Sequence, residues 1–230
     1  MPILKRITVS NMARKCKQKQ LKDAIALVVD GQDEKWYIDK VKDHYPCDAL
    51  KSIRVKPELP VRKKVQELFD FAENKLNEGY SYVVLIFDMD EPLKDIKELN
   101  TFKELYAKYT AVRNNNLTGR QKSKYGWMNN LLLIVNNPCL EYWYLLHYRK
   151  TTKFFADFAA LLPELRKIKE LAKYEKCENY YNNHPNIYER LGKNNGLNNA
   201  RMNAIPFNIS NCSTQGCSEM NNLFDYFDGL

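Results

Sequence analysis

The chain has 230 residues, of which 44% are hydrophobic and 12% aromatic, so it can bury a sizeable core and is not wholly disordered. Its longest apolar runs, 24–29 and 82–87, are far shorter than the roughly 18 residues of a membrane-spanning helix. Residues 1–20 are basic without the apolar block of a secretory signal. We therefore expect a cytoplasmic protein with no membrane segment, whose six cysteines are reduced thiols.

The net charge of +8 is unevenly distributed. Six Lys and Arg residues and no acid lie in 1–20, which we treat as a basic N-terminal segment. A second acid-free stretch, 111–126, contains Arg113, Arg120, Lys122 and Lys124. Such stretches favour polyanions, most often nucleic acid, although solvated loops that keep a protein soluble have the same composition.

Short apolar runs predict buried strands of a parallel sheet at 24–29, 82–87 and 131–135, and an alternating pattern predicts a shorter strand at 53–55. Apolar residues at helical spacing predict helices at 33–45, 61–76, 93–109 and 137–148, the last one capped and started by Asn137 and Pro138. We expect a loop at 113–126.

Alternating strands and helices predict an α/β domain over residues 21–150, with a mainly parallel sheet flanked by helices. The pattern changes at residue 151. Residues 151–176 are expected to be helical, and 220–227 to form a short helix with Leu223 and Phe227 inward. Dense aromatic residues indicate that 151–230 is a mostly helical region packed on the α/β domain.

Acidic and amide side chains follow the three main predicted strands. They are Asp30 and Glu34 after the first, Asp88 and Asp90 after the second, and Asn136, Asn137 and Glu141 after the third. Ligands of an open parallel sheet bind beyond the carboxyl ends of its strands, so we expect these groups to converge. Alternate residues of an extended chain point the same way, which lets Asp88 and Asp90 face one Mg²⁺ or Mn²⁺. Alternatively, Asp88 only ends its strand and Asp90 caps the next helix.

Other reactive residues have simpler interpretations. His147 is expected to be a core histidine packed on Trp143, and Cys139 a small buried residue. A zinc site would need Cys177, His184, Cys212 and Cys217, whose spacings do not match the usual patterns. The chain has no phosphate-binding loop motif, which argues against ATP hydrolysis.

Three motifs resemble known families. The run Leu27–Tyr37 resembles the opening V-E-G-x-x-E motif of Toprim domains, and Ile86–Asp90 resembles their D-x-D strand end. The run Asn136–His147 is similar to the N-P-x-x-E-x-W-x-L-L-H signature of the RloB-like family, which is often found with phage-defence and restriction loci. The segment Tyr174–Lys176 fits that family's weaker C-terminal pattern.

The resemblance implies a Toprim-like fold that binds Mg²⁺ or Mn²⁺. By position, Asp30 or Glu34 acts as general acid/base or ligand, Asp88 and Asp90 bind the metal, and Glu141 is a further site acid. One departure is that Asp30 replaces the usual glutamate and is one methylene shorter. Asp30 is therefore a shifted metal ligand, or Glu34 does its work, or catalysis is weakened.

These features together favour a metal-dependent endonuclease of bacterial anti-phage defence that cuts RNA or DNA. Arg113, Arg120, Lys122 and Lys124 would hold the nucleic-acid backbone. The alternatives are a non-catalytic nucleic-acid-binding subunit, or a subunit activated by a partner ATPase or restriction complex. The sequence leaves the substrate, the partner and the oligomeric state open.

Overall fold

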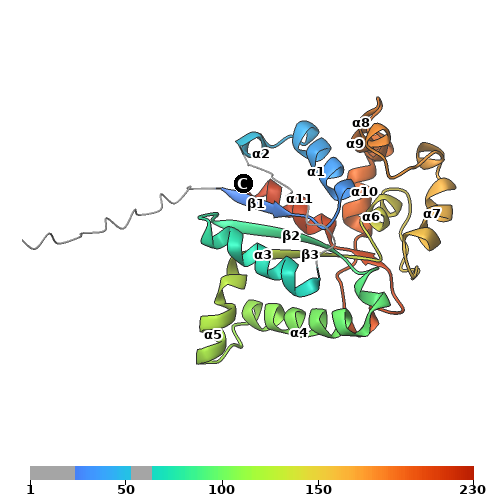
Figure 1. Ribbon diagram of the computed structural model, residues 1–230. Coiled ribbons are helices and arrows are strands. Elements are labelled where there is room, and N and C mark those ends of the chain that lie inside the picture. Colours follow the sequence, from blue (N-terminus) through green and yellow to red (C-terminus); the bar gives the residue numbers. More distant parts are fainter. Residues whose placement is uncertain (1–23, 53–63) are drawn as a thin grey trace, which may run out of the picture.

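A computed structural model describes residues 24–52 and 64–230. Its centre is a sheet of order β1-β2-β3-β4 (Figure 1). The strands β1 (Ile25–Val28), β2 (Tyr82–Asp88) and β3 (Leu131–Asn137) are parallel, and the two-residue β4 (Cys217–Ser218) runs antiparallel to β3. The predicted α/β fold with a mainly parallel sheet is therefore confirmed. The strand expected at 53–55 lies outside the described residues.

Helices cover both faces of this sheet. Successive residues of each strand point to opposite faces, and because the residues on both faces are apolar, both faces are buried under helices. One face packs against α1 (Gln32–His44), α6 (Glu141–Leu146) and α11 (Met220–Asp228). The other packs against α3 (Val65–Asn77) and α4 (Ile96–Arg113). Val84 and Ile86 belong to the first core, and Leu85 and Phe87 to the second.

Shorter elements complete the connections of the α/β part. They are α2 (Asp48–Ser52), η1 (Pro92–Lys94), α5 (Gly119–Tyr125) and η2 (Gly126–Asn130). The expected loop at 113–126 is wrong, because residues 119–125 form α5, which Thr118 begins with a capping box. Asp90 does not cap the following helix, since Asp95 is the N-cap of α4 and accepts a hydrogen bond from the Lys97 amide at 2.8 Å.

The region after residue 150 wraps around the same sheet. Its elements are α7 (Phe158–Arg166), η3 (Lys169–Leu171), α8 (Glu178–Asn182), α9 (Ile187–Gly192), η4 (Lys193–Asn195), α10 (Gly196–Asn203), η5 (Ile209–Asn211), β4 and α11. The final helix is confirmed, with Leu223 and Phe227 buried. The expected helix over 151–176 is shorter than predicted, and β4 was not predicted.

The helix predicted at 137–148 begins later than expected. Asn137 is the last residue of β3 and α6 starts at Glu141, so Asn137 is not a helix cap. Its side-chain amide instead donates to the carbonyls of Cys212 and Gln215, both at 2.8 Å. This side chain therefore attaches the C-terminal region to the end of a central strand.

A half-buried glutamate, Glu219, continues the pairing of β3 beyond the short β4. Glu219 Oε2 accepts from the Val135 amide at 3.1 Å, and Oε1 accepts from the Phe207 amide at 2.9 Å. The Glu219 amide donates to the Val135 carbonyl at 3.0 Å. The buried backbone groups of the strand thus find partners. Among the described residues, no helix is long and apolar enough to cross a membrane.

Gly216 tests how tightly the C-terminal region is packed. A Cβ at this position would lie 2.4 Å from the Tyr142 ring and 2.5 Å from the Lys153 carbonyl oxygen. We expect Gly216→Ala to lower the free energy of unfolding by about 1–3 kcal/mol in urea denaturation, because this core cannot expand without strain. Gly192→Ala is the matched control, since nothing lies within 4 Å of its Cβ position. Equal stability of both variants would contradict this packing.

Candidate active site

The five acids that the sequence singled out converge at the carboxyl ends of the parallel strands. Asp30 follows β1, Glu34 lies in the first turn of α1, Asp88 ends β2, Asp90 follows it, and Glu141 begins α6. Their carboxylates influence one another electrostatically, and Asp33 adds a sixth. We call these six residues the acidic cluster. Glu34, Asp88 and Glu141 are 3%, 8% and 0% exposed, so its centre is shielded from water.

Asp88 is held by the neighbouring strand and by the loop that follows it. Its Oδ1 accepts from the Asn136 side-chain amide at 3.1 Å, and its Oδ2 accepts from the Leu140 backbone amide at 3.1 Å. Asn136 in turn accepts from the Ser218 hydroxyl of β4 at 2.6 Å. The orientation of Asp88 therefore depends on residues from β3, β4 and the Asn-Pro loop.

The Asn-Pro loop also fixes the segment that carries Asp90. The carbonyl of Pro138 accepts from the amides of Met89 at 2.9 Å and Asp90 at 3.0 Å. The Met89 amide also donates to the Asn136 carbonyl at 3.0 Å. Backbone hydrogen bonds thus join the Asp88–Asp90 segment to the Asn-Pro loop.

The segment Tyr174–Lys176 closes the acidic cluster from the C-terminal region. Glu141 Oε1 accepts from the Tyr174 hydroxyl at 2.7 Å and from Lys176 Nζ at 2.9 Å. Lys176 Nζ also lies 2.7 Å from Asp33 Oδ2. From the sequence, Tyr174, Lys176 and Asp33 are not predicted to be site residues. The only signal was the fit of Tyr174–Lys176 to a family pattern.

Burial makes the acids of the cluster hard to ionise. It raises the pKa of Glu34 and Asp88 well above the usual range, and the neighbouring carboxylates add to the rise. Burial likewise raises the pKa of Glu141, although Lys176 opposes the rise. For Asp30, burial and the charge of Asp90 raise the pKa to about 6. Among the described residues, the charge of Lys176 opposes the rise in pKa of Glu34, Asp88 and Glu141, and the charge of Lys94 opposes that of Asp90.

The donor set fits a divalent cation. Glu34 Oε2 and Glu141 Oε2 are buried without a hydrogen-bond partner among the residues that the structure describes. A carboxylate oxygen in this state lacks the compensation that burial normally requires. Carboxylate oxygens are the ligands that Mg²⁺ and Mn²⁺ prefer. Within residues 24–52 and 64–230, no group of three or more His, Cys, Asp and Glu side chains could hold a metal ion in its present arrangement. Ligation would therefore require side-chain adjustment.

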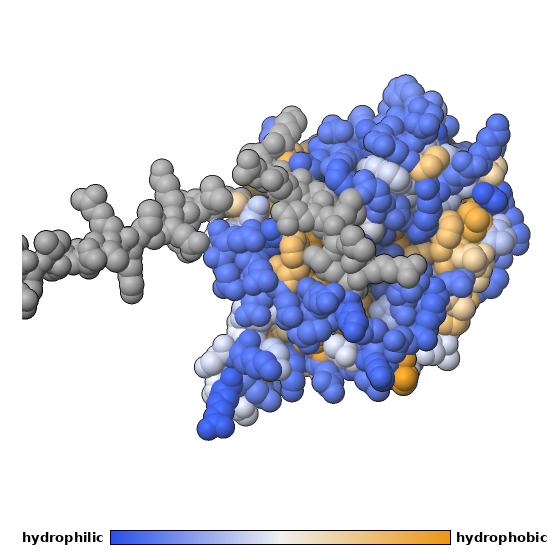
Figure 2. Space-filling model, viewed as in Figure 1, coloured by the Kyte–Doolittle hydropathy of each residue, from blue (hydrophilic) through white to orange (hydrophobic). Residues whose placement is uncertain are grey.

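The basic residues expected to hold nucleic acid lie at the other end of the sheet. Arg120, Lys122 and Lys124 belong to α5, which leads through η2 into the start of β3 (Figure 1). Arg113 binds the Leu131 carbonyl and lies 5.3 Å from the Tyr109 ring centroid, so it supports the structure there. These basic residues therefore do not adjoin the acids. Figure 2 shows a mostly hydrophilic surface over α5.

The simpler interpretations of His147 and Cys139 are confirmed. His147 is 3% exposed, its Nδ1 lies 2.9 Å from the Trp143 carbonyl, and burial lowers its pKa to about 4. The His147 and Trp143 rings pack edge-on. Cys139 is buried. In the described part of the chain, Cys177, His184, Cys212 and Cys217 do not form a metal site.

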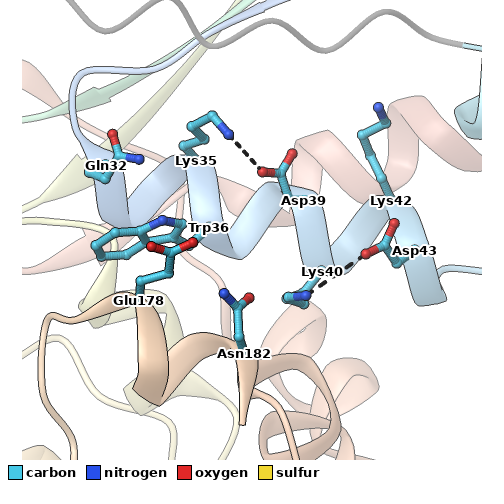
Figure 3. A pocket seen from close by; sticks show the side chains of 9 residues that line it. All are labelled: Gln32, Lys35, Trp36, Asp39, Lys40, Lys42, Asp43, Glu178 and Asn182. Carbon is cyan, nitrogen blue, oxygen red and sulfur yellow. Dashed lines mark hydrogen bonds and ion pairs between the residues drawn. The ribbon is translucent and has the colours of Figure 1, made fainter.

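A groove of about 340 Å³ lies between α1 and α8 (Figure 3). Gln32 and Trp36 line it from α1, and Glu178 and Asn182 from α8. Acidic and basic side chains line it in equal numbers, and pairs such as Lys35 and Asp39, 3.0 Å apart, neutralise each other within α1. The groove is therefore not a basic track toward the acidic cluster.

Because the pKa of Asp30 is raised in the folded protein, its ionised form lowers the stability of the protein at neutral pH. Stability contributed by the protonated form is complete below the unfolded pKa of about 4 and is lost as pH rises through about 6. We expect Asp30→Asn to stabilise the protein in EDTA at about pH 8 by roughly 2–3 kcal/mol. The gain should shrink toward pH 4. Chemical denaturation at several pH values measures this, and a pH-independent difference would contradict it.

Comparison with known proteins places the chain in a family. The pattern of the RloB-like protein family matches residues 25–225, which include β1, the whole acidic cluster and the segment Tyr174–Lys176. No curated protein and no solved structure matches the chain. Because the family match spans most of the sequence, the chain belongs to the RloB-like protein family.

Proposed function

We propose that this protein is a metal-dependent endonuclease of the Toprim type that hydrolyses phosphodiester bonds of RNA or DNA in anti-phage defence. The observation that carries the proposal is the pair of buried, unpartnered carboxylate oxygens of Glu34 and Glu141 inside a cluster of further acids. Such a cluster is unfavourable by itself and becomes favourable when a cation is bound. The family resemblance supports the biological setting.

Asp88, Asp90 and Asp30 would hold Mg²⁺ or Mn²⁺. When bound, such an ion polarises the phosphate and makes a coordinated water a better nucleophile. Asp88 is suited to this role because the amides of Asn136 and Leu140 fix both of its oxygens at 3.1 Å, which orients the carboxylate. Asp90 is less buried than Asp88, so it is the more accessible of the two to an ion that arrives from solvent.

The proton of the attacking water needs an acceptor, and Glu34 is better placed than Asp30 for this task. Its Oε2 has no hydrogen-bond partner, and its side chain is almost fully buried among the other acids. Its raised pKa makes it a stronger base once it is ionised. Asp30, one methylene shorter than the usual glutamate, then acts as a ligand.

The proposed role of the acidic cluster is tested by removing the carboxylates of Asp88 and Asp90. We expect Asp88→Ala/Asp90→Ala to lose at least 100-fold of the Mg²⁺- or Mn²⁺-dependent cleavage of a mixed DNA and total RNA sample, because the ligands are gone. Asp70→Asn, an exposed acid of α3, is the control and should cut normally. Circular dichroism checks that the double variant is folded.

The result also separates the proposal from its alternatives. Equal cleavage by the double variant and the wild type would sink the metal mechanism. Nucleic-acid binding without cleavage in any metal would favour a binding subunit. Cleavage that appears only after co-expression with an ATPase or restriction complex would favour a partner-activated subunit.

A second proposal is that α5 binds the nucleic-acid backbone away from the cutting site. We expect replacement of Arg120, Lys122 and Lys124 by Gln to weaken oligonucleotide binding and to flatten its salt dependence by about one log–log unit for each lost phosphate contact. Fluorescence anisotropy at several salt concentrations measures both effects. Unchanged affinity would exclude α5 from the interface and leave the acidic cluster unaffected.

A further inference from the structure

Lys176 occupies a special place in the acidic cluster. Its ammonium lies 2.7 Å from Asp33 Oδ2 and 2.9 Å from Glu141 Oε1. It also lies 4.3 Å from the centroid of the Phe158 ring at the start of α7, and this cation–π contact stabilises the ammonium charge. Three separate elements therefore converge on one side-chain nitrogen.

The position of Lys176 is at the boundary between buried acids and solvent. Its side chain is 33% exposed, whereas that of Glu141 is 0% exposed. A lysine ammonium has three N–H donors, and Asp33 and Glu141 accept two hydrogen bonds from it. Its third N–H has no hydrogen-bond acceptor within residues 24–52 and 64–230, so it can serve a group that arrives from the solvent side.

A phosphodiester that approaches the cluster meets repulsion from its carboxylates. Among the described residues, Lys176 is the one cation with ion pairs to acids of the cluster. Lys94, the other lysine that acts on Asp90, is ion-paired with Glu91 at 2.8 Å, outside the cluster. Lys176 is thus the described side chain that can offset the charge of an incoming phosphate at this place.

We infer that Lys176 is a catalytic residue that donates a hydrogen bond to a non-bridging oxygen of the phosphodiester, with Asp33 and Glu141 as the positioning residues that aim its ammonium. This inference rests on the proposed endonuclease function. In the hydrolysis, the water oxygen forms a new bond to phosphorus, one ester P–O bond breaks, and the leaving oxygen takes up a proton. Lys176 forms and breaks no covalent bond and stabilises the charge on the phosphate.

The opposing view is that Lys176 is only a counter-ion that lets Glu141 be buried. The two roles differ in their effect on metal binding. A structural counter-ion is needed to form the site, so its loss should damage metal binding. A phosphate-binding cation is not needed by the metal, so its loss removes a repelling charge and leaves the carboxylates free for the ion.

The experiment uses the full chain and compares Lys176→Met, Lys176→Arg and wild type. Mn²⁺ binding is measured by calorimetry, and kcat and KM are measured with single-stranded and duplex oligonucleotides of RNA and DNA. We expect Lys176→Met to bind Mn²⁺ at least as tightly as wild type and to lose about 100-fold or more in kcat. Lys176→Arg should recover part of the loss because it keeps the charge.

Lys173→Met is the matched control, because it removes the same charge from an exposed position three residues away. It should bind Mn²⁺ and cut as wild type does. Cleavage by Lys176→Met within about threefold of wild type would overturn the catalytic role, as would loss of its Mn²⁺ binding. A wild type that cuts none of the oligonucleotides would overturn the proposed function itself, which distinguishes the two failures.

Discussion

The repulsion among buried carboxylates at one edge of the sheet is the constraint on which this structure depends. Two unit charges about 4 Å apart interact by about 4 kcal/mol at an effective dielectric constant of 20. Glu34, Asp88 and Glu141 are nearly inaccessible to water, so hydration cannot weaken this repulsion. In the part of the chain that the structure describes, directed donors and the ammonium group of Lys176 hold them. An arrangement of this kind sacrifices stability and is typical of functional sites.

The C-terminal region completes the site rather than standing beside it. Ser218 of β4 orients Asn136, which orients Asp88, and the segment Tyr174–Lys176 binds Glu141. Tyr174 is itself fixed by the Tyr181 hydroxyl at 2.6 Å. The orientation of the Asp88 carboxylate therefore depends on a contact between Asn136 and Ser218, which are more than 80 positions apart in the sequence. The α/β part and the C-terminal region are thus joined at the acidic cluster.

Charge is segregated along the strand direction. The acidic cluster lies beyond the carboxyl ends of the strands, and α5 with its Lys and Arg residues lies near the start of β3. A nucleic acid that touches both regions would have to cross the side of the sheet. Under the proposed function, the acidic end supplies the chemistry, and a distant basic helix adds affinity that does not depend on sequence.

The sequence alone determined the three parallel strands and the convergence of Asp30, Glu34, Asp88, Asp90 and Glu141, because continuous apolar runs predict buried parallel strands and their carboxyl ends meet at one edge. It did not determine β4, the strand role of Asn137 or the position of α5. Two-residue strands and side-chain hydrogen bonds leave no periodic pattern. Only the tertiary structure brought Lys176 to Asp33 and Glu141, because ion pairs between distant segments depend on chain packing and not on local sequence.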